Sequence, residues 1–395
     1  MIKHTNRWLL PEGIEELLPA QAVPLEQLRR EILDLYRSWG YELIVPPFIE
    51  YLDSLLTGTG HDLDLKTFKL IDQLSGRMLG VRADMTPQAA RIDAHRLKRE
   101  APTRLCYLGT VLHTLPDGFA GSRSLLQVGA ELFGHAGPES DVEILQLMVA
   151  TLALTGVEDV YIDLGHVGIF RGLAADAGLD AEQEAFLFDA LQRKAIPEIE
   201  TFLAELDLST AQRERLAGLA VLNGEEEALD RAEAMLEGSG QAARAALDNL
   251  RRIAALARRR LPGLPLHFDL AELRGYQYQT GVVFAAFVAG CGQEIARGGR
   301  YDEIGEVFGR ARPATGFSAD VRSLMQLGRR EWPVAPGAIL APAEDDALLA
   351  DRVAALRAGG EVVIQQLPGQ QGSRREMHCD RTLRWDGAGW VVEKI

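Results

Sequence analysis

Two segments of this chain place acidic and amide side chains where a ligand could reach them. Asp84 follows a short apolar strand and precedes a helix that Thr86 is expected to cap. A carboxylate there can approach backbone N–H groups and face a cleft, although an ordinary aspartate at a helix start would look the same. Gln127, Gly129 and Glu131 share one strand face by the two-residue period. Polar groups on a covered sheet face need partners, which favours a lined pocket over simple solvent exposure.

Two further segments combine arginine, glycine and tyrosine, residues 273–278 (LRGYQY) and 297–302 (RGGRYD). Paired glycines allow a ligand to approach the backbone closely, and arginine beside tyrosine suits a carboxylate with an aromatic wall. Arg274, Tyr278 and Tyr301 are therefore candidate binding residues. On chemistry alone, these segments predict a small-ligand cleft and do not identify the ligand.

Other kinds of chemistry lack their residue patterns. The sequence contains no GxxxxGK[ST] phosphate loop, no GxSxG nucleophile turn and no HExxH or CxxC metal motif. Its eight histidines show no ligand spacing, and its three cysteines are widely separated and odd in number. We therefore expect no metal site and no cofactor.

The bulk properties limit the partners. The formal net charge of −15 argues against a protein that grips a long stretch of nucleic acid, although a local basic patch is compatible with it. The sequence has no signal peptide and no stretch of the roughly 20 apolar residues that a membrane span requires. We therefore expect a cytoplasmic protein with no membrane partner.

Hydrophobic periodicity predicts the elements that position these residues. The first part of the chain reads as alternating helices and strands, with a hairpin over 66–81 and two long strands. Predicted helices cover residues 24–39, 50–57, 86–96 and 139–155, and predicted strands cover 41–45, 66–71, 77–81, 104–112, 124–133 and 158–164.

From about 169 to 260 strand signals vanish, which predicts a helical insertion. Strands are then expected at 266–270, 281–289 and 294–297, with Gly298 and Gly299 breaking the pattern before a helix over 301–308. A strand and helix follow over 314–327, and residues 335–395 read as a small α/β segment with a terminal hairpin over 381–394. The fold class is therefore α+β, with a mostly antiparallel core over 1–330.

Taken in order, these segments resemble the catalytic core of histidyl-tRNA synthetase, a class II aminoacyl-tRNA synthetase. Helix 24–39 with YELIVPP resembles the first motif, which forms the dimer interface. Residues 104–134 are similar to the second motif, 273–284 to the histidine-specific signature, and 314–324 to the third motif. The resemblance implies a class II synthetase-like core over residues 1–330.

The departures from the synthetase pattern fall on the ATP site. His113 and Leu115 stand where the second motif has an α-phosphate arginine and a glutamate near the adenine. Ser323 replaces a γ-phosphate arginine, and Asp320 replaces a glycine close by. Losing two phosphate-binding arginines and adding a carboxylate should cost several kcal/mol of ATP binding. About 60 residues follow position 335, fewer than an anticodon-binding domain needs. The resemblance thus implies that adenylation and tRNA reading are lost.

The histidine pocket, by contrast, is largely retained. The resemblance implies that Asp84 meets the amino group, that Arg274 faces the carboxylate and that Tyr301 lies near the imidazole. It also implies that Gln127 and Glu131 line the sheet, while the signature's paired tyrosines become Tyr278 and Gln279.

A synthetase core of this kind is similar to the regulatory subunits of short-form ATP phosphoribosyltransferases. This resemblance implies a chain without catalytic residues that activates a catalytic partner and relays histidine feedback in the first step of histidine biosynthesis. It also implies a homodimer through the first-motif helix within a hetero-octamer of four regulatory and four catalytic chains, with L-histidine as effector and no tRNA. The alternatives are an active synthetase or amino-acid ligase, and a synthetase-like sensor of histidine or uncharged tRNA.

Overall fold

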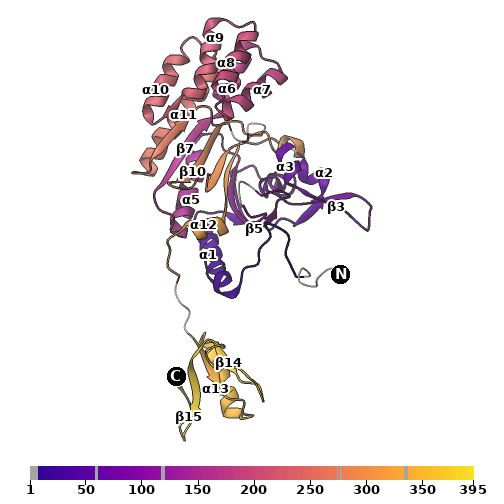
Figure 1. The fold of residues 1–395 in the computed structure, drawn as a ribbon, viewed down its shortest axis with the longest axis vertical. Coiled ribbons are helices and arrows are strands. Elements are labelled where there is room, and N and C mark those ends of the chain that lie inside the picture. The colour runs from indigo at the N-terminus through magenta and orange to yellow at the C-terminus, as the bar shows by residue number, and fades with distance from the viewer. Residues whose placement is uncertain (1–7, 58–60, 117–120, 274, 276–277, 333–336) are drawn as a thin grey trace, which may run out of the picture. The chain divides into compact units, whose positions relative to one another are not determined.

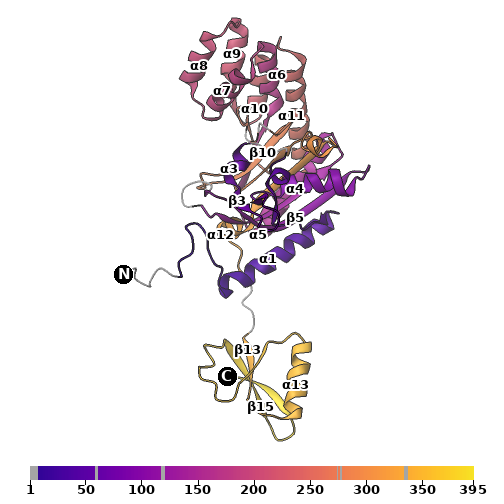
Figure 2. The same cartoon turned by 90° about the vertical axis from the view of Figure 1, so that its right-hand side faces the viewer.

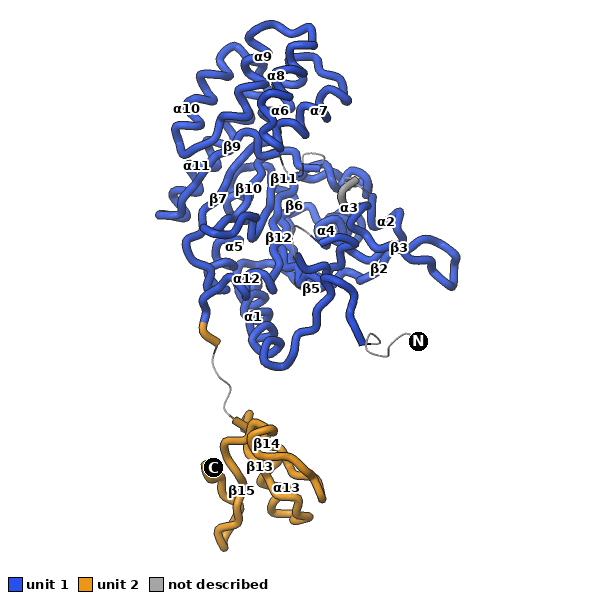
Figure 3. Tube along the Cα trace, in the orientation of Figure 1, with its two compact units in different colours: residues 1–330 blue, residues 331–395 orange. Residues whose placement is uncertain are grey.

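The computed structural model describes residues 8–57, 61–116, 121–273, 275, 278–332 and 337–395. The chain divides into two compact units, residues 1–330 and 331–395, which are coloured blue and orange in Figure 3. The first unit contains the candidate binding residues, and the second is the small α/β segment.

A nine-stranded sheet forms the centre of the first unit (Figure 1). Its strand order is β1-β5-β6-β12-β11-β10-β7-β9-β8, and neighbours are antiparallel except for the β1–β5 and β7–β9 pairs. In sheet order the strands are Glu42–Leu43, Thr103–Leu112, Ser124–Phe133, Ala314–Asp320, Ala296–Arg300, Val282–Val288, Val160–His166, Leu266–Asp269 and Asn223–Gly224. The mostly antiparallel α+β prediction is confirmed.

Two helices cover one face of this sheet. α5 (Pro138–Thr155) packs against β12, β6 and β11, and α1 (Pro19–Ser38) packs against α5, as Figures 1 and 2 show. The buried side of α1 carries Leu25, Leu28, Ile32 and Tyr36, which is the predicted helical stripe. The helix begins five residues earlier than predicted, because Pro19 occupies its first turn and Pro24 is accommodated inside it.

The helical insertion is also confirmed, and its helices gather at one end of the sheet in both views (Figures 1 and 2). Asp180 and Ser209 each form a capping box with a glutamine three residues later, which fixes the starts of α7 and α9. The six α-helices are α6 (Val167–Ala177), α7 (Ala181–Gln192), α8 (Ile196–Glu205), α9 (Thr210–Gly218), α10 (Glu226–Met235) and α11 (Gln241–Arg260).

A small antiparallel sheet, β2-β4-β3, lies beside the main sheet in the first unit. Its strands are Ile49–Tyr51, Met78–Val81 and Phe68–Ile71, so the predicted hairpin is confirmed and β2 is an additional strand. The nearby helices are α2 (Leu52–Leu56), α3 (His61–Lys66), α4 (Thr86–Arg91) and a π-helix over Ile92–Leu97. The predicted helix 86–96 is thus an α-helical turn followed by π-helix.

Two local predictions were wrong. Gly298 and Gly299 do not end a strand but lie inside β11, where they pair with Phe317 and Gly316 of β12. Residues 301–308 form turns and a short 3-10 helix, Glu306–Phe308, rather than an α-helix. Gly298 and Gly299 were read as breakers, whereas a strand that lies close to a neighbouring backbone also requires glycine.

The second unit is a four-stranded sheet with one helix. Its strand order is β14-β13-β15-β16, formed by Val363–Gln365, Ala338–Ala341, Cys379–Trp385 and Trp390–Lys394. α13 (Ala347–Ala358) buries Leu349 and Val353 against Ile339, Leu383 and Trp390. The predicted small α/β segment and its terminal hairpin are confirmed.

Candidate functional site

A cavity of about 780 Å³ opens on the sheet face opposite α5. Strands β6, β11 and β12, the start of α4, and Gly275, Tyr278 and Gln279 contribute to its wall. Phe188 and Gln192 reach it from α7 of the insertion. Its volume falls within the usual range for small-molecule sites. The sequence-predicted residues that line it are Asp84, His113, Gln127, Glu131, Tyr278, Tyr301, Asp320 and Ser323.

Glu131 lies at the floor of this cavity and is 1% exposed. The Tyr107 hydroxyl donates to Glu131 Oε1 at 2.8 Å, and the Tyr301 hydroxyl donates to Oε2. The carboxyl fits because Gly316 lies opposite, where a Cβ would come within 1.5 Å of Oε2. Burial raises the pKa of Glu131 to about 8, although both tyrosine hydrogen bonds oppose the shift. The group is therefore mostly neutral at pH 7 and can donate as well as accept a hydrogen bond.

Asp84 and Gln127 form the second polar element of the wall. Gln127 Nε2 donates to Asp84 Oδ1 at 2.7 Å, while Gln127 Oε1 accepts the Met85 N–H at 2.9 Å. Asp84 Oδ1 also accepts the Thr86 N–H at 2.9 Å, so Asp84 rather than Thr86 satisfies the start of α4. The predicted capping role of Thr86 was wrong, and its hydroxyl contacts that of Tyr107 instead, at 2.9 Å. These bonds leave a half-buried carboxylate at the cavity wall, a suitable acceptor for an ammonium group.

The two candidate tyrosines differ in exposure. Tyr301 is 2% exposed and reaches the cavity floor, whereas Tyr278 is 38% exposed and lines the wall beside Gly275. Gly275 has a φ of +71°, and a Cβ there would lie 2.8 Å from the Tyr278 ring. Arg274, the expected carboxylate partner, lies outside the described residues.

The opposite end of the cavity carries the positions at which ATP contacts were expected to be lost. Asp320 Oδ2 accepts the N–H and the hydroxyl of Ser323 at 3.1 and 2.6 Å, and so caps α12 (Val321–Leu327). Asp320 Oδ1 accepts the Leu126 N–H at 2.8 Å. A carboxylate thus occupies a helix N-terminus, a position at which a phosphate group would otherwise be favoured.

His113 and Leu115 likewise offer no phosphate contact. His113 is 5% exposed, and its Nε2 lies 2.9 Å from the Ala83 carbonyl oxygen. Leu115 is 66% exposed and does not line the cavity. Neither side chain offers the guanidinium fork that binds a triphosphate in the synthetase pattern.

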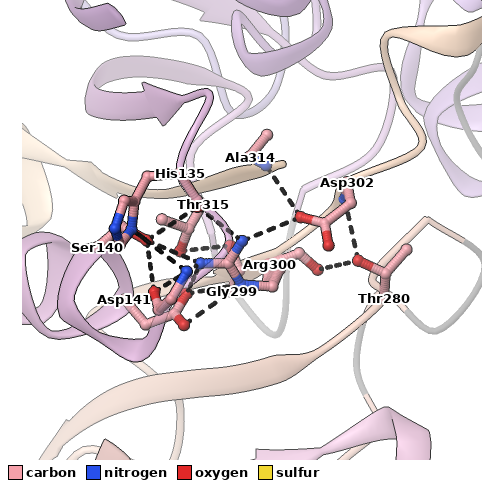
Figure 4. Close-up of polar contacts among 10 residues, drawn as sticks. His135, Ser140, Asp141, Thr280, Gly299, Arg300, Asp302, Ala314 and Thr315 are labelled. Atoms are coloured by element: carbon pink, nitrogen blue, oxygen red, sulfur yellow. Dashed lines mark hydrogen bonds and ion pairs between the residues drawn. The ribbon is translucent and has the colours of Figure 1, made fainter. Parts of the chain in front are cut away.

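A buried ionic network, which the sequence analysis missed, joins Arg300 at the end of β11 to the start of α5 (Figure 4). Arg300, 6% exposed, bonds Asp141 at the start of α5 through its Nε and Nη2 atoms, at 2.9–3.3 Å. It also bonds Asp302 Oδ1 through Nη1 at 3.1 Å. Burial raises the pKa of Asp141 to about 6 despite the neighbouring guanidinium.

The described residues contain no group of three or more histidine, cysteine or acidic side chains that could hold a metal ion. Among the same residues, no helix is long and apolar enough to cross a membrane.

Comparison with known proteins agrees with this geometry. Residues 13–324 match the histidyl-tRNA synthetase family, and residues 336–393 match the C-terminal domain of ATP phosphoribosyltransferase subunit HisZ. The fold superposes on a Bacillus halodurans structure described as an ATP phosphoribosyltransferase regulatory subunit/histidyl-tRNA synthetase. That match has a TM-score of 0.82, 27% identity, and coverage of 94% of this chain and 96% of the other. A histidyl-tRNA synthetase from Nostoc, 19% identical with a TM-score of 0.76 over 95% of this chain and 91% of its own, shares the fold. The first unit is therefore a class II synthetase-like core.

Relatives with higher sequence identity show which family within this fold the chain belongs to. An ATP phosphoribosyltransferase regulatory subunit of Thioalkalivibrio sulfidiphilus is 62% identical, with 99% of each chain covered. One from Alkalilimnicola ehrlichii is 60% identical over 99% of this chain and 98% of its own. The chain belongs to the family of ATP phosphoribosyltransferase regulatory subunits.

Proposed function

We propose that this chain is a non-catalytic regulatory subunit that activates a short-form ATP phosphoribosyltransferase and relays feedback by L-histidine. The relatives that match 99% of the chain carry the name of a regulatory subunit, which supports a role in histidine biosynthesis. Catalysis then belongs to the partner chain. The proposal extends to a cytoplasmic location, a homodimer through α1, and a hetero-octamer of four regulatory and four catalytic chains.

The observation that carries the proposal is the contrast between the two ends of one cavity. The floor and wall retain a buried carboxyl, a carboxylate and tyrosines, which suit an amino acid with a polar ring. At the other end Asp320 caps α12 where triphosphate charge would lie, and His113 and Ser323 stand in place of the two phosphate-binding arginines. A chain that binds histidine without ATP can sense the amino acid but cannot adenylate it.

We place histidine in this cavity, with its amino group on Asp84 and its imidazole beside the hydrogen-bonded pair of Tyr301 and Glu131. Gln127 orients Asp84, and Arg274 is proposed to face the carboxylate, with Tyr278 at the wall. Inhibition by histidine requires tighter binding to the less active assembly, because a ligand shifts an equilibrium only through differential affinity. We further propose that residues 335–395 do not read an anticodon.

The decisive experiment measures phosphoribosyl-ATP formation by the short-form catalytic subunit, with and without this chain and with and without L-histidine. We expect activation by the chain and reversal of that activation by histidine. No change in rate under any condition would overturn the proposal.

A pair of variants then locates the histidine. Gln127→Ala is expected to weaken inhibition by histidine while activation is retained, since Gln127 holds Asp84. Gln241→Ala, at an exposed position on the insertion outside the cavity wall, is the matched control and should behave as the unaltered chain. Calorimetry with ATP separates the ligase alternative, which requires ATP binding; we expect none.

A further inference from the structure

The network around Arg300 joins three segments that are distant in sequence (Figure 4). Arg300 contacts two side chains in the first turn of α5, those of Asp141 and Ser140, the latter through its hydroxyl at 2.9 Å. It also donates to the carbonyl oxygens of His135 and Gly137, just before this helix, at 3.2 and 3.3 Å. Its other partner is Asp302, two residues along its own segment. An arginine has five N–H donors in a fixed fork, and this arrangement engages each of its three nitrogens.

Asp302 and Thr280 extend the network to the segment that enters the cavity wall. Asp302 Oδ1 accepts the Ala314 N–H at 2.9 Å, and the Asp302 N–H donates to Thr280 Oγ1 at 2.9 Å. The Thr280 N–H donates to the Arg300 carbonyl oxygen at 2.7 Å. Thr280, which follows Tyr278 and Gln279 in the chain, is therefore bonded directly to the end of β11.

The position of Tyr301 follows from these bonds. It lies between Arg300 and Asp302, and its own N–H donates to the Ala314 carbonyl oxygen at 2.8 Å. Because strand residues alternate, Arg300 points toward α5 while Tyr301 points into the cavity and reaches Glu131. Tyr278, Gln279 and Tyr301 all line the cavity, and each lies within two residues of a member of the network.

Stability alone explains this network poorly. A buried ion pair often contributes no more to stability than apolar residues of similar volume, because both charges lose their hydration. A planar fork with many bonds does fix the relative positions of the segments it joins. The geometry therefore indicates that the network fixes the positions of the adjacent residues that line the cavity.

We propose that Arg300 is a positioning residue for the histidine pocket. It connects Tyr301 and the 278–280 segment to the start of α5 and so holds them in their binding positions. This inference rests on the proposed histidine site and deepens it. If the pocket is no longer held in one arrangement, the apparent affinity falls in proportion to the fraction of chains that remain competent to bind.

The test compares Arg300→Lys with Arg312→Lys in the full chain. Arg312 is a matched control because its side chain is equally buried, pairs with Asp93 and donates to the Ala101 carbonyl oxygen. Unlike Arg300, which adjoins Tyr301, it has no cavity-lining residue within two positions in the chain. Both variants should lose comparable stability in denaturant. Only Arg300→Lys should raise the calorimetric Kd for L-histidine, by roughly ten-fold or more.

A gentler pair covers the case in which Arg300→Lys fails to fold. Thr280→Val keeps the shape but removes the oxygen that accepts the Asp302 N–H, and should weaken histidine binding, whereas Thr280→Ser keeps the hydroxyl and should restore it. Equal Kd values for the Arg300→Lys and Arg312→Lys variants, or for Thr280→Val and the unaltered chain, would overturn the positioning role alone. Absence of histidine binding by the unaltered chain would overturn both this inference and the proposed histidine site.

Discussion

Replacing Glu131 by glutamine is expected to reduce the pH dependence of unfolding between pH 6.5 and 8. In the folded chain burial raises the pKa of this carboxyl to about 8, whereas in the unfolded chain its pKa should be about 4.3. Between these values the folded state holds a proton that the unfolded state lacks. The free energy of unfolding therefore decreases as the pH rises through this window.

The expected size of the effect follows from the same two values. Linkage limits the decrease to about 1.4 kcal/mol for each pH unit, and the slope diminishes close to the folded pKa. From pH 6.5 to 8 the unaltered chain should thus lose about 1.5 kcal/mol relative to Glu131→Gln. At pH 6.5 the two proteins should unfold with similar free energies, because a neutral carboxyl and an amide are alike in shape and polarity.

The assay is urea denaturation of both proteins at several pH values, without histidine, with the difference between them as the measured quantity. Other groups cancel in this difference. Two other buried groups titrate below this pH window in the folded chain, since burial raises the pKa of Asp141 to about 6 and lowers that of His166 to about 4. Parallel curves from pH 6.5 to 8 would refute the assignment of a neutral Glu131 to the folded chain.

Three further outcomes are expected. Gly129→Ala should cost about 1–3 kcal/mol of stability, because its Cβ would lie 2.4 Å from the Tyr107 ring. Gly292→Ala is the control, since a Cβ there meets nothing within 4 Å. An equal cost for both variants in urea denaturation would contradict the reasoning. Asp320→Ala should cost about 1 kcal/mol by removing the cap of α12, and an unchanged urea midpoint would count against that role. L-Histidine at one hundred times its Kd should stabilise the chain by about 2.7 kcal/mol and raise its Tm. The Gln127→Ala variant should show a smaller rise at the same concentration, and an equal rise would place histidine elsewhere.

Periodicity predicted most of the fold because most elements lie with one face against a core. The stripe of α1 was read from the helical period, and the long strand that carries both Gln127 and Glu131 was read from alternation. One prediction failed because two glycines are required by their neighbours across the sheet. Gly298 and Gly299 were read as breakers, yet they lie inside β11 because neighbouring groups approach so closely.

The sequence predicted the polar residues that line the cavity, but not the residues that hold them in place. Glu131 and Gln127 stood out because polar groups alternate with apolar ones in a buried strand. Tyr107 was missed, although Gly129 carried a signal, since it pairs with Tyr107 and leaves room for that ring. The Arg300–Asp141 pair joins residues 159 positions apart, and no local pattern encodes such a contact.

The order of strands in the main sheet has a consequence for synthesis of the chain. Phe133 of β6 pairs with Ala314 of β12, so the whole helical insertion is translated between two neighbouring strands. At roughly 5–20 residues per second, β6 waits about 10–40 s on the ribosome before its partner exists. During that time one edge of the half-built sheet is open to other chains, a known route to aggregation. Nascent chains arrested before residue 314 should leave β6 open to protease, and protection should begin only once β12 has left the ribosome.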